Sequence, residues 1–183
     1  MDTFEHKHGS FLFTAGDSER TSHFAEGTSP ERGPIPASAL AIDGGEHLLH
    51  FRDQGNIFIK LGSATGSQNL ALGTQQVMVG IGIPVHRHFN VDEVFYVLEG
   101  RGTLILNDVR HVLEKGAAVF ISRNAWHGFE NPEHELLLLW VVTPAGLDGF
   151  FRETCNPPGA PRKQLSLERI KEIAIKKYGT EYR

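Results

Sequence analysis

The stretch that decides the fold runs Gly80-Ile-Gly-Ile-Pro-Val-His86-Arg-His88-Phe-Asn-Val-Asp-Glu93-Val-Phe-Tyr-Val-Leu-Glu-Gly100. Side chains at positions i and i+2 of a β-strand share a face, so His86 and His88 can converge on one ion. Glu93 follows a four-residue corner at the start of the next apolar run, and a hairpin-like bend would bring its carboxylate beside the two imidazoles. The stretch therefore predicts part of a metal site built on two strands.

A second block supplies a third imidazole. It runs Gly116-Ala-Ala-Val-Phe-Ile-Ser-Arg-Asn-Ala-Trp-His127-Gly-Phe-Glu-Asn131. Ligands drawn from three strands require a curved or closed sheet, which favours a barrel. These residues also have alternative interpretations. One inward histidine is most often a hydrogen-bonded core residue, and Asp92 could replace Glu93 as the acidic partner. The spacing as a whole favours one divalent metal.

The rest of the chain from position 46 has the pattern of an all-β protein. Short β-type runs recur about every ten residues, separated by Gly, Asn-Asp and Asn-Pro, as in an antiparallel sandwich or barrel. Asn107-Asp108 predicts a tight hairpin turn, because both residue types tolerate the backbone angles that it needs. The expected strands are 48–51, 57–61, 75–79, 93–98, 102–106, 117–121, 126–130 and 135–143.

Two flanking segments differ from this pattern, and the chain divides into an arm (1–45), a barrel (46–144) and a helical extension (145–183). The arm is rich in Gly, Ser, Pro and charge, with one possible strand at 10–14. In the extension, apolar residues at helical spacing follow Ser166, a probable N-cap, and precede Gly179, a C-cap. A shorter helix is expected at 147–154, bringing Phe150 or Phe151 onto the barrel.

Composition narrows the classes of protein. The 183-residue chain has a formal net charge of −4, which argues weakly against a nucleic-acid partner. Its start has no secretory signal pattern, and its longest apolar run, 136–142, is too short for a membrane span. The single cysteine, Cys155, excludes an internal disulfide and fits a reducing cytoplasm. A cytoplasmic protein is therefore expected.

The two glycine-bounded blocks resemble the two motifs of the cupin superfamily. The first matches in full from Gly80 to Gly100, whereas the second has Ser122 and Asn124 where the family has Pro and Gly. Asn is the best non-glycine occupant of a left-handed turn, so the turn should survive. The resemblance implies a jelly-roll barrel that holds one divalent transition metal, with two coordination positions left open. Iron, manganese, nickel or zinc would suit it. The implied ligands are His86, His88, Glu93 and His127.

Strand alternation also predicts what surrounds the metal. An inward Glu93 makes Phe95 inward, and an inward His127 makes Phe129 inward and Trp126 outward. An apolar, aromatic wall would suit a small aromatic or diketone-like substrate. No Arg or Lys cluster is expected to face the mouth, since Arg87 should point away. The candidate wall residues are Phe95, Phe120, Phe129, Trp140, Met78 and Phe58.

The resemblance leaves several functions open. The first expectation is a dioxygenase, similar to quercetinase-like cupins, that acts on a small aromatic or enolisable substrate, with Glu93 as a possible catalytic base. A metal-dependent isomerase, cyclase or lyase is the second, and a non-catalytic ligand sensor is the third. His50 and His111 are weaker candidates for a general base. The arm and the C-terminal helix suggest a homodimer, because both can cover a barrel edge or a partner.

Overall fold

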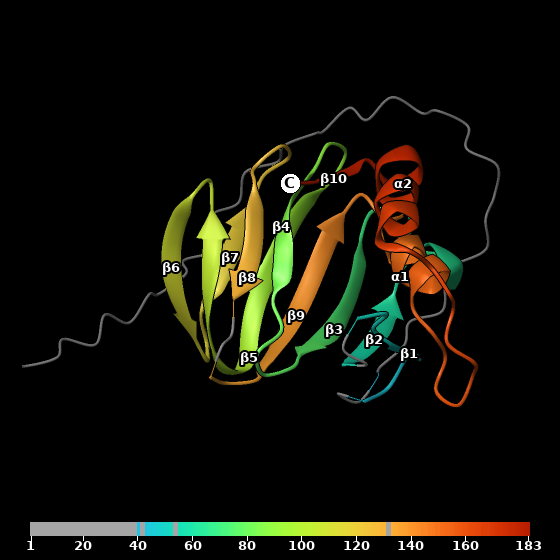
Figure 1. Ribbon diagram of the computed structural model, residues 1–183, viewed down its shortest axis with the longest axis horizontal. Coiled ribbons are helices and arrows are strands. Elements are labelled where there is room, and N and C mark those ends of the chain that lie inside the picture. Colours follow the sequence, from blue (N-terminus) through green and yellow to red (C-terminus); the bar gives the residue numbers. More distant parts are fainter. Residues whose placement is uncertain (1–39, 41–42, 53–54, 131–132) are drawn as a thin grey trace, which may run out of the picture. The chain divides into compact units, whose positions relative to one another are not determined.

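The computed structural model describes residues 40, 43–52, 55–130 and 133–183, and within them the chain folds as an antiparallel jelly-roll barrel (Figure 1). Hydrogen-bonded neighbours follow the order β1-β2-β3-β9-β5-β8-β4-β10, and β6 and β7 pair with β5. The strands are β1 (Glu46–Leu49), β2 (Asn56–Leu61), β3 (Ala71–Val77), β4 (Ile83–His88), β5 (Asp92–Leu106), β6 (Val109–Glu114), β7 (Ala118–Ile121), β8 (His127–Glu130), β9 (Leu136–Thr143) and β10 (Thr180–Tyr182). The all-β barrel expected from the sequence is confirmed.

One long strand joins the two layers of the barrel. The sequence predicted two strands, 93–98 and 102–106, whereas β5 runs unbroken for 15 residues. Up to Gly100, β5 pairs with β7 and β9, and from Arg101 onwards it pairs with β6 and β8. Gly100 makes the switch possible, because its φ is +88° and a Cβ there would lie 1.8 Å from the Glu135 carbonyl oxygen.

Two turns that asparagine allows have the expected backbone. Asn107 and Asp108 both have positive φ, 47° and 68°, and connect β5 to β6 as the predicted hairpin. Asn124 has a φ of 66° in the turn before β8, so it replaces the glycine of the family motif without loss of the turn. Strand β6 itself was missing from the predicted set of strands.

The core lies between the two layers. Its largest fully buried side chains include Trp140 on β9, Phe129 on β8 and Ile57 on β2. On β2 and β9 the positions next to Ile57 and Trp140 are half-buried, the alternation that the barrel pattern predicted.

The segment after β9 forms two helices and then returns to the barrel. Helix α1 (Asp148–Thr154) confirms the expected short helix, and Phe151 packs on Trp140 with ring centroids 5.4 Å apart. Helix α2 (Leu167–Tyr178) begins at Ser166, whose side chain accepts from the Arg169 N–H, and ends at Gly179 with a φ of 59°. The final strand, β10, was not expected; it pairs with β4 (Figure 1).

Two other predictions concern the N-terminal arm and the absence of a membrane span. Most of the arm, including the possible strand at 10–14, lies outside the described residues. Among the described residues, no helix combines the length and apolar character needed to cross a membrane.

Candidate metal centre

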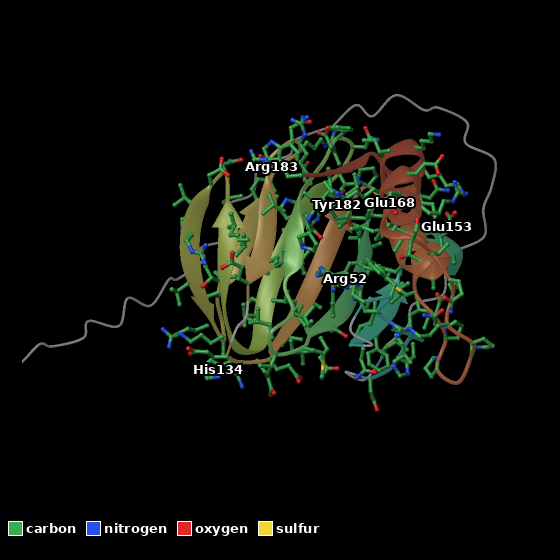
Figure 2. The ribbon with its side chains drawn as sticks, viewed as in Figure 1. Arg52, His134, Glu153, Glu168, Tyr182 and Arg183 are labelled. Carbon is green, nitrogen blue, oxygen red and sulfur yellow. The ribbon has the colours of Figure 1, made fainter. Side chains whose placement is uncertain are left out.

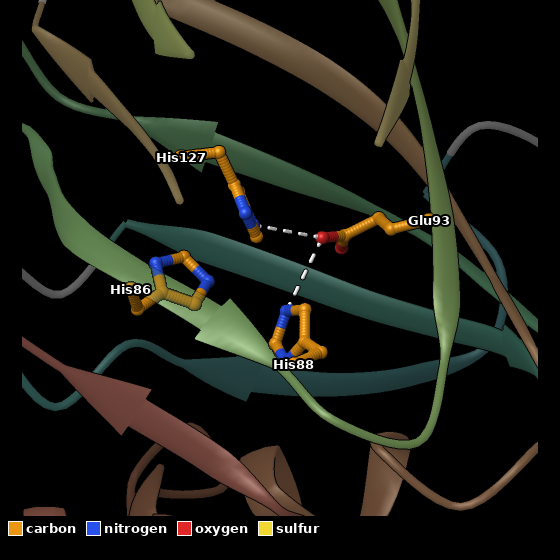
Figure 3. Close-up of side chains that lie close together, drawn as sticks. All are labelled: His86, His88, Glu93 and His127. Atoms are coloured by element: carbon orange, nitrogen blue, oxygen red, sulfur yellow. Dashed lines mark ion pairs between the residues drawn. The ribbon is translucent and has the colours of Figure 1, made fainter. Parts of the chain in front are cut away.

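Four buried side chains converge inside the barrel, as predicted (Figure 3). His86 and His88 share the inner face of β4, and the register places His127 on β8 directly opposite His86. Glu93 enters from β5, after the corner that follows β4. The candidate ligand atoms of all four residues lie within 4.8 Å of one another. The assignment of these residues as metal ligands remains a prediction.

Each histidine has its Nδ1 atom engaged on the side away from the cluster. His86 Nδ1 lies 2.8 Å from the Pro84 carbonyl oxygen, and His127 Nδ1 lies 3.0 Å from the Ala125 carbonyl oxygen. A carbonyl can only accept, so both rings carry a proton on Nδ1 and turn the lone pair of Nε2 toward the cluster. His88 Nδ1 contacts the Thr180 hydroxyl at 2.9 Å. This second layer of contacts is the arrangement that orients metal-binding imidazoles.

The atoms that face the centre fit a bound cation. Glu93 Oε2 lies 3.2 Å from His127 Nε2 and 3.3 Å from His88 Nε2, yet these three buried atoms have no hydrogen-bond partner of suitable geometry among the described residues. Each buried polar atom without a partner costs about 1–3 kcal/mol. Two ligands bonded at about 2.1 Å to one ion are about 3–4 Å apart, a spacing close to that of this cluster. A divalent transition metal therefore suits the donor set.

The electrostatics of the cluster favour the same protonation states. Burial lowers the pKa of His86 well below its ordinary value, and the neighbouring His127 and His88 lower it further. Burial acts to raise the pKa of Glu93, but the facing His127 and His88 outweigh it and hold this pKa well below the usual range. A neutral imidazole at His86 and an ionised carboxylate at Glu93 are the forms that bind a metal.

Strand β10 pairs with the strand that carries His86 and His88, and it was not predicted from the sequence. The register places Thr180 opposite His88 and Tyr182 opposite His86. The Tyr182 ring stacks on the His86 ring with centroids 5.3 Å apart, and burial raises the pKa of its hydroxyl. The available signal was Thr-Glu-Tyr after the C-cap Gly179, since Thr and Tyr are favoured in strands and flank a charged residue.

A cavity of about 280 Å³ opens beside the cluster. Side chains from β3, β4, β5, β10, α1 and α2 enclose it, together with the turn between β1 and β2. The lining includes His86, His88, Glu93, Phe95, Gln75, Ile83, Phe51, Phe150, Phe151, Tyr182, His50, Arg52, Lys171 and Arg183. Three of the four candidate ligands, His86, His88 and Glu93, therefore border a partly aromatic chamber large enough for a small molecule.

The structure sorts the six predicted wall residues. Phe95 lines the cavity, and Phe129 packs behind it with ring centroids 4.9 Å apart. Trp140 is buried but lies one layer back: its ring lies against Gly73, where a Cβ would come within 2.3 Å of the indole. Phe151 on α1 lies against this ring and borders the cavity in its place.

Phe129 and Trp140 therefore do not line the cavity themselves, and neither do the other three predicted wall residues. Phe120 is 64% exposed, because Val119 and Ile121 take the inward positions of β7. Phe58 lies on the outer side of β2, stacked on His47 with ring centroids 4.4 Å apart. Met78 follows the end of β3, is half-buried and does not line the cavity.

Polar residues near the site also depart from expectation at one place. Arg87 points away from the cluster as predicted, and its Nε donates to Glu181 at 2.7 Å. Asp92 does not compete with Glu93, since it accepts from the Arg123 backbone N–H at 3.0 Å. His50 lines the cavity, whereas His111 is exposed on β6. The expectation that no basic cluster faces the mouth is wrong, because three cations line it: Arg52, Lys171 and Arg183.

Comparisons with known proteins agree with the fold. Residues 73–143 match the family described as "Cupin domain". An uncharacterized protein of Methanocaldococcus jannaschii, MJ1618, is 30% identical over 69 residues, covering 34% of this chain and 55% of that protein. The chain thus spans about half the length of the curated relative that it matches.

Three solved structures have a fold similar to this barrel. KdgF from Halomonas sp. is 18% identical with a TM-score of 0.54, and the match covers 62% of this chain and 99% of that one. The polyketide cyclase RemF from Streptomyces resistomycificus is 20% identical with a TM-score of 0.53, covering 78% and 96%. An RmlC-like cupin from Shewanella frigidimarina is 21% identical with a TM-score of 0.52, covering 62% and 96%. The motifs, the barrel and the family match together identify residues 73–143 as a cupin domain.

Proposed function

We propose that the protein is a metal-dependent enzyme that oxygenates a small aromatic or enolisable substrate. One observation carries the proposal: unpartnered ligand atoms of His88, Glu93 and His127 converge at the side of an apolar, aromatic cavity. A bound transition metal would supply a Lewis acid with open positions for a chelating substrate and dioxygen. His86, His88, Glu93 and His127 would hold it.

The protein's own residues would bind and shield the substrate. Phe95 and Phe151 offer flat apolar surfaces beside the ligands, and burial of the cluster keeps bulk water from it. Glu93 would take up a proton if it left the metal during turnover, and it has the one side-chain carboxylate among the described lining residues.

A second candidate, a metal-dependent isomerase, cyclase or lyase, is favoured by Tyr182. The Tyr182 hydroxyl forms no hydrogen bond within the described part of the chain, although its ring lies on His86 at the cavity wall. Such a hydroxyl can give a proton to a substrate held beside the metal without any need for dioxygen. The fold likeness to a polyketide cyclase is too distant to favour either reaction.

Anaerobic assays separate the two candidates. The purified protein is analysed for metals, and oxygen uptake and substrate loss are measured with catechols and β-diketones, in air and under argon. Turnover that requires dioxygen supports the oxygenase, and equal turnover under argon supports the isomerase, cyclase or lyase. Binding without turnover under either condition contradicts both and favours a ligand-binding role. The proposed homodimer is tested separately by sedimentation at micromolar concentration, where a monomer would contradict it.

A further inference from the structure

The cavity has a polar layout that its aromatic walls do not explain. Gln75 on β3 is 7% exposed, lines the cavity and forms no side-chain hydrogen bond within the described residues. A buried amide without a protein partner is costly, so this group is placed to bind a ligand. Because an amide both donates and accepts, Gln75 suits a polar ligand atom inside the cavity.

Positive charge gathers at the opening of the same cavity. Arg52, Lys171 and Arg183 line it, and among the described lining residues Glu93 supplies the one carboxylate. Arg183 is already paired with Asp108. Neither Arg52 nor Lys171 forms an ion pair with any residue that the structure describes. Of these two, Arg52 is the one whose head group is fixed by a side-chain hydrogen bond, to the Gly82 carbonyl, so it is the better placed to bind a ligand.

Arg52 is held in place while part of its guanidinium stays available. It follows β1 in the turn toward β2, and its Nη1 donates to the Gly82 carbonyl at 3.0 Å, which ties this turn to the approach of β4. The remaining N–H groups form the planar fork that matches a carboxylate. Arg52 is also close enough to Tyr182 to act on its pKa, and Figure 2 shows Tyr182 next to α2 with Arg52 below it in the view.

The volume of the cavity limits the size of a ligand that reaches from the four-residue cluster to Arg52. An apolar cavity of about 150 Å³ holds one benzene ring. The volume here, about 280 Å³, admits one ring with a few substituents and falls below the usual range for drug-sized ligands.

We infer that the cavity takes a small organic carboxylate of about one ring, with oxygen donors toward the four-ligand cluster and its carboxylate on Arg52. Gln75 hydrogen-bonds a polar atom between these ends, and Phe95 and Phe151 contact the ring. The inference rests on the proposed function for the metal end alone. Recognition at the mouth belongs to Arg52 and does not need the metal.

The test uses matched acids and amides. Zinc-loaded full-length protein, which does not turn over catechols by redox chemistry, is titrated calorimetrically with 3,4-dihydroxybenzoate and 3,4-dihydroxybenzamide. A charge-assisted bond to an exposed arginine should favour the acid by about tenfold. In Arg52→Gln this ratio should fall to about one while amide affinity changes little, and Arg52→Lys should retain part of the preference. Lys171→Gln serves as the matched control and should keep the ratio.

Gln75 and the metal are tested in the same titrations. Gln75→Leu should weaken the binding of the acid and of the amide by a similar factor, about fivefold or more, because both compounds lose the same hydrogen bond. Equal affinity of the wild type for acid and amide, or an Arg52→Gln variant that keeps the full ratio, would overturn the inference. Benzoate and benzamide on metal-free protein repeat the comparison. If zinc does not bind but benzoate is still preferred through Arg52, the proposed function fails and the carboxylate site stands.

Discussion

Replacing Thr180 by valine should weaken metal binding by about 10–100-fold with little effect on the metal-free fold. The Thr180 hydroxyl lies 2.9 Å from His88 Nδ1, and both residues are at least 95% buried. When His88 Nε2 binds a metal, the neutral ring must carry its proton on Nδ1, and the hydroxyl accepts it. Valine keeps the branched shape that suits β10 but removes this acceptor.

The magnitude follows from the state in which the acceptor is needed. Without metal, His88 can move its proton to Nε2, beside Glu93 Oε2 at 3.3 Å, and the missing hydroxyl then leaves an unpaired lone pair on Nδ1, which costs less than a buried N–H without an acceptor. With metal, the buried Nδ1–H has no acceptor and costs about 1–3 kcal/mol. Since about 1.4 kcal/mol is a factor of ten, this range agrees with the loss of about 10–100-fold seen when second-layer partners of metal ligands are removed.

The assay is zinc competition against a chromophoric chelator, with thermal unfolding in EDTA as the second readout. Thr180→Ser keeps the hydroxyl and is the matched control, so its zinc affinity should stay within about threefold of the wild type. A Thr180→Val protein that binds zinc as tightly as the wild type would refute the reasoning. So would a variant that loses stability in EDTA as strongly as it loses zinc, because the hydroxyl would then serve the fold and not the metal state.

Three further predictions concern Glu93, a pair of glycines and a pair of phenylalanines. Glu93→Gln should retain at least tenfold less metal after dialysis, because a neutral amide is a weaker ligand than a carboxylate; full metal content with full activity would exclude a role for Glu93. Gly100→Ala should lower the free energy of unfolding in urea by more than about 2 kcal/mol, since its Cβ would meet a carbonyl oxygen at 1.8 Å, whereas Gly80→Ala, with φ of +76° and nothing within 4 Å, should cost about 1 kcal/mol. Phe95→Ala should cost about 3–5 kcal/mol and Phe120→Ala less than about 0.5 kcal/mol, and equal costs would contradict their inward and outward positions.

Features that depend on nearby residues were predictable. Strand alternation puts His86 and His88 on one face whatever the rest of the chain does, and it points Arg87 the other way. Asn107 and Asp108 adopt the hairpin angles that their short polar side chains tolerate. Ser166 caps α2 through its own side chain. Each of these results rests on contacts within a few positions of sequence.

Predictions of which residues line the cavity failed where the sequence did not show which face of a strand points inward. An error of one position in the assumed phase moves a side chain to the opposite face. The inward position predicted for Phe120 is wrong for this reason, since its side chain is exposed. Trp140 faces inward, but whether its ring reaches the cavity depends on Gly73 of a neighbouring strand. Burial of an aromatic residue was therefore easier to predict than its place in the wall.

The sequence by itself determined the barrel and the four candidate ligands, because motif spacing, period-two alternation and turn residues are local properties of the chain. Only the tertiary structure decided what surrounds the ligands. It brings Thr180 and Tyr182 of β10 onto β4, some ninety positions away, and it ties Arg52 to Gly82 at the cavity mouth. These contacts arise from closure of the barrel in space, and no periodicity along the chain records which distant segments meet there.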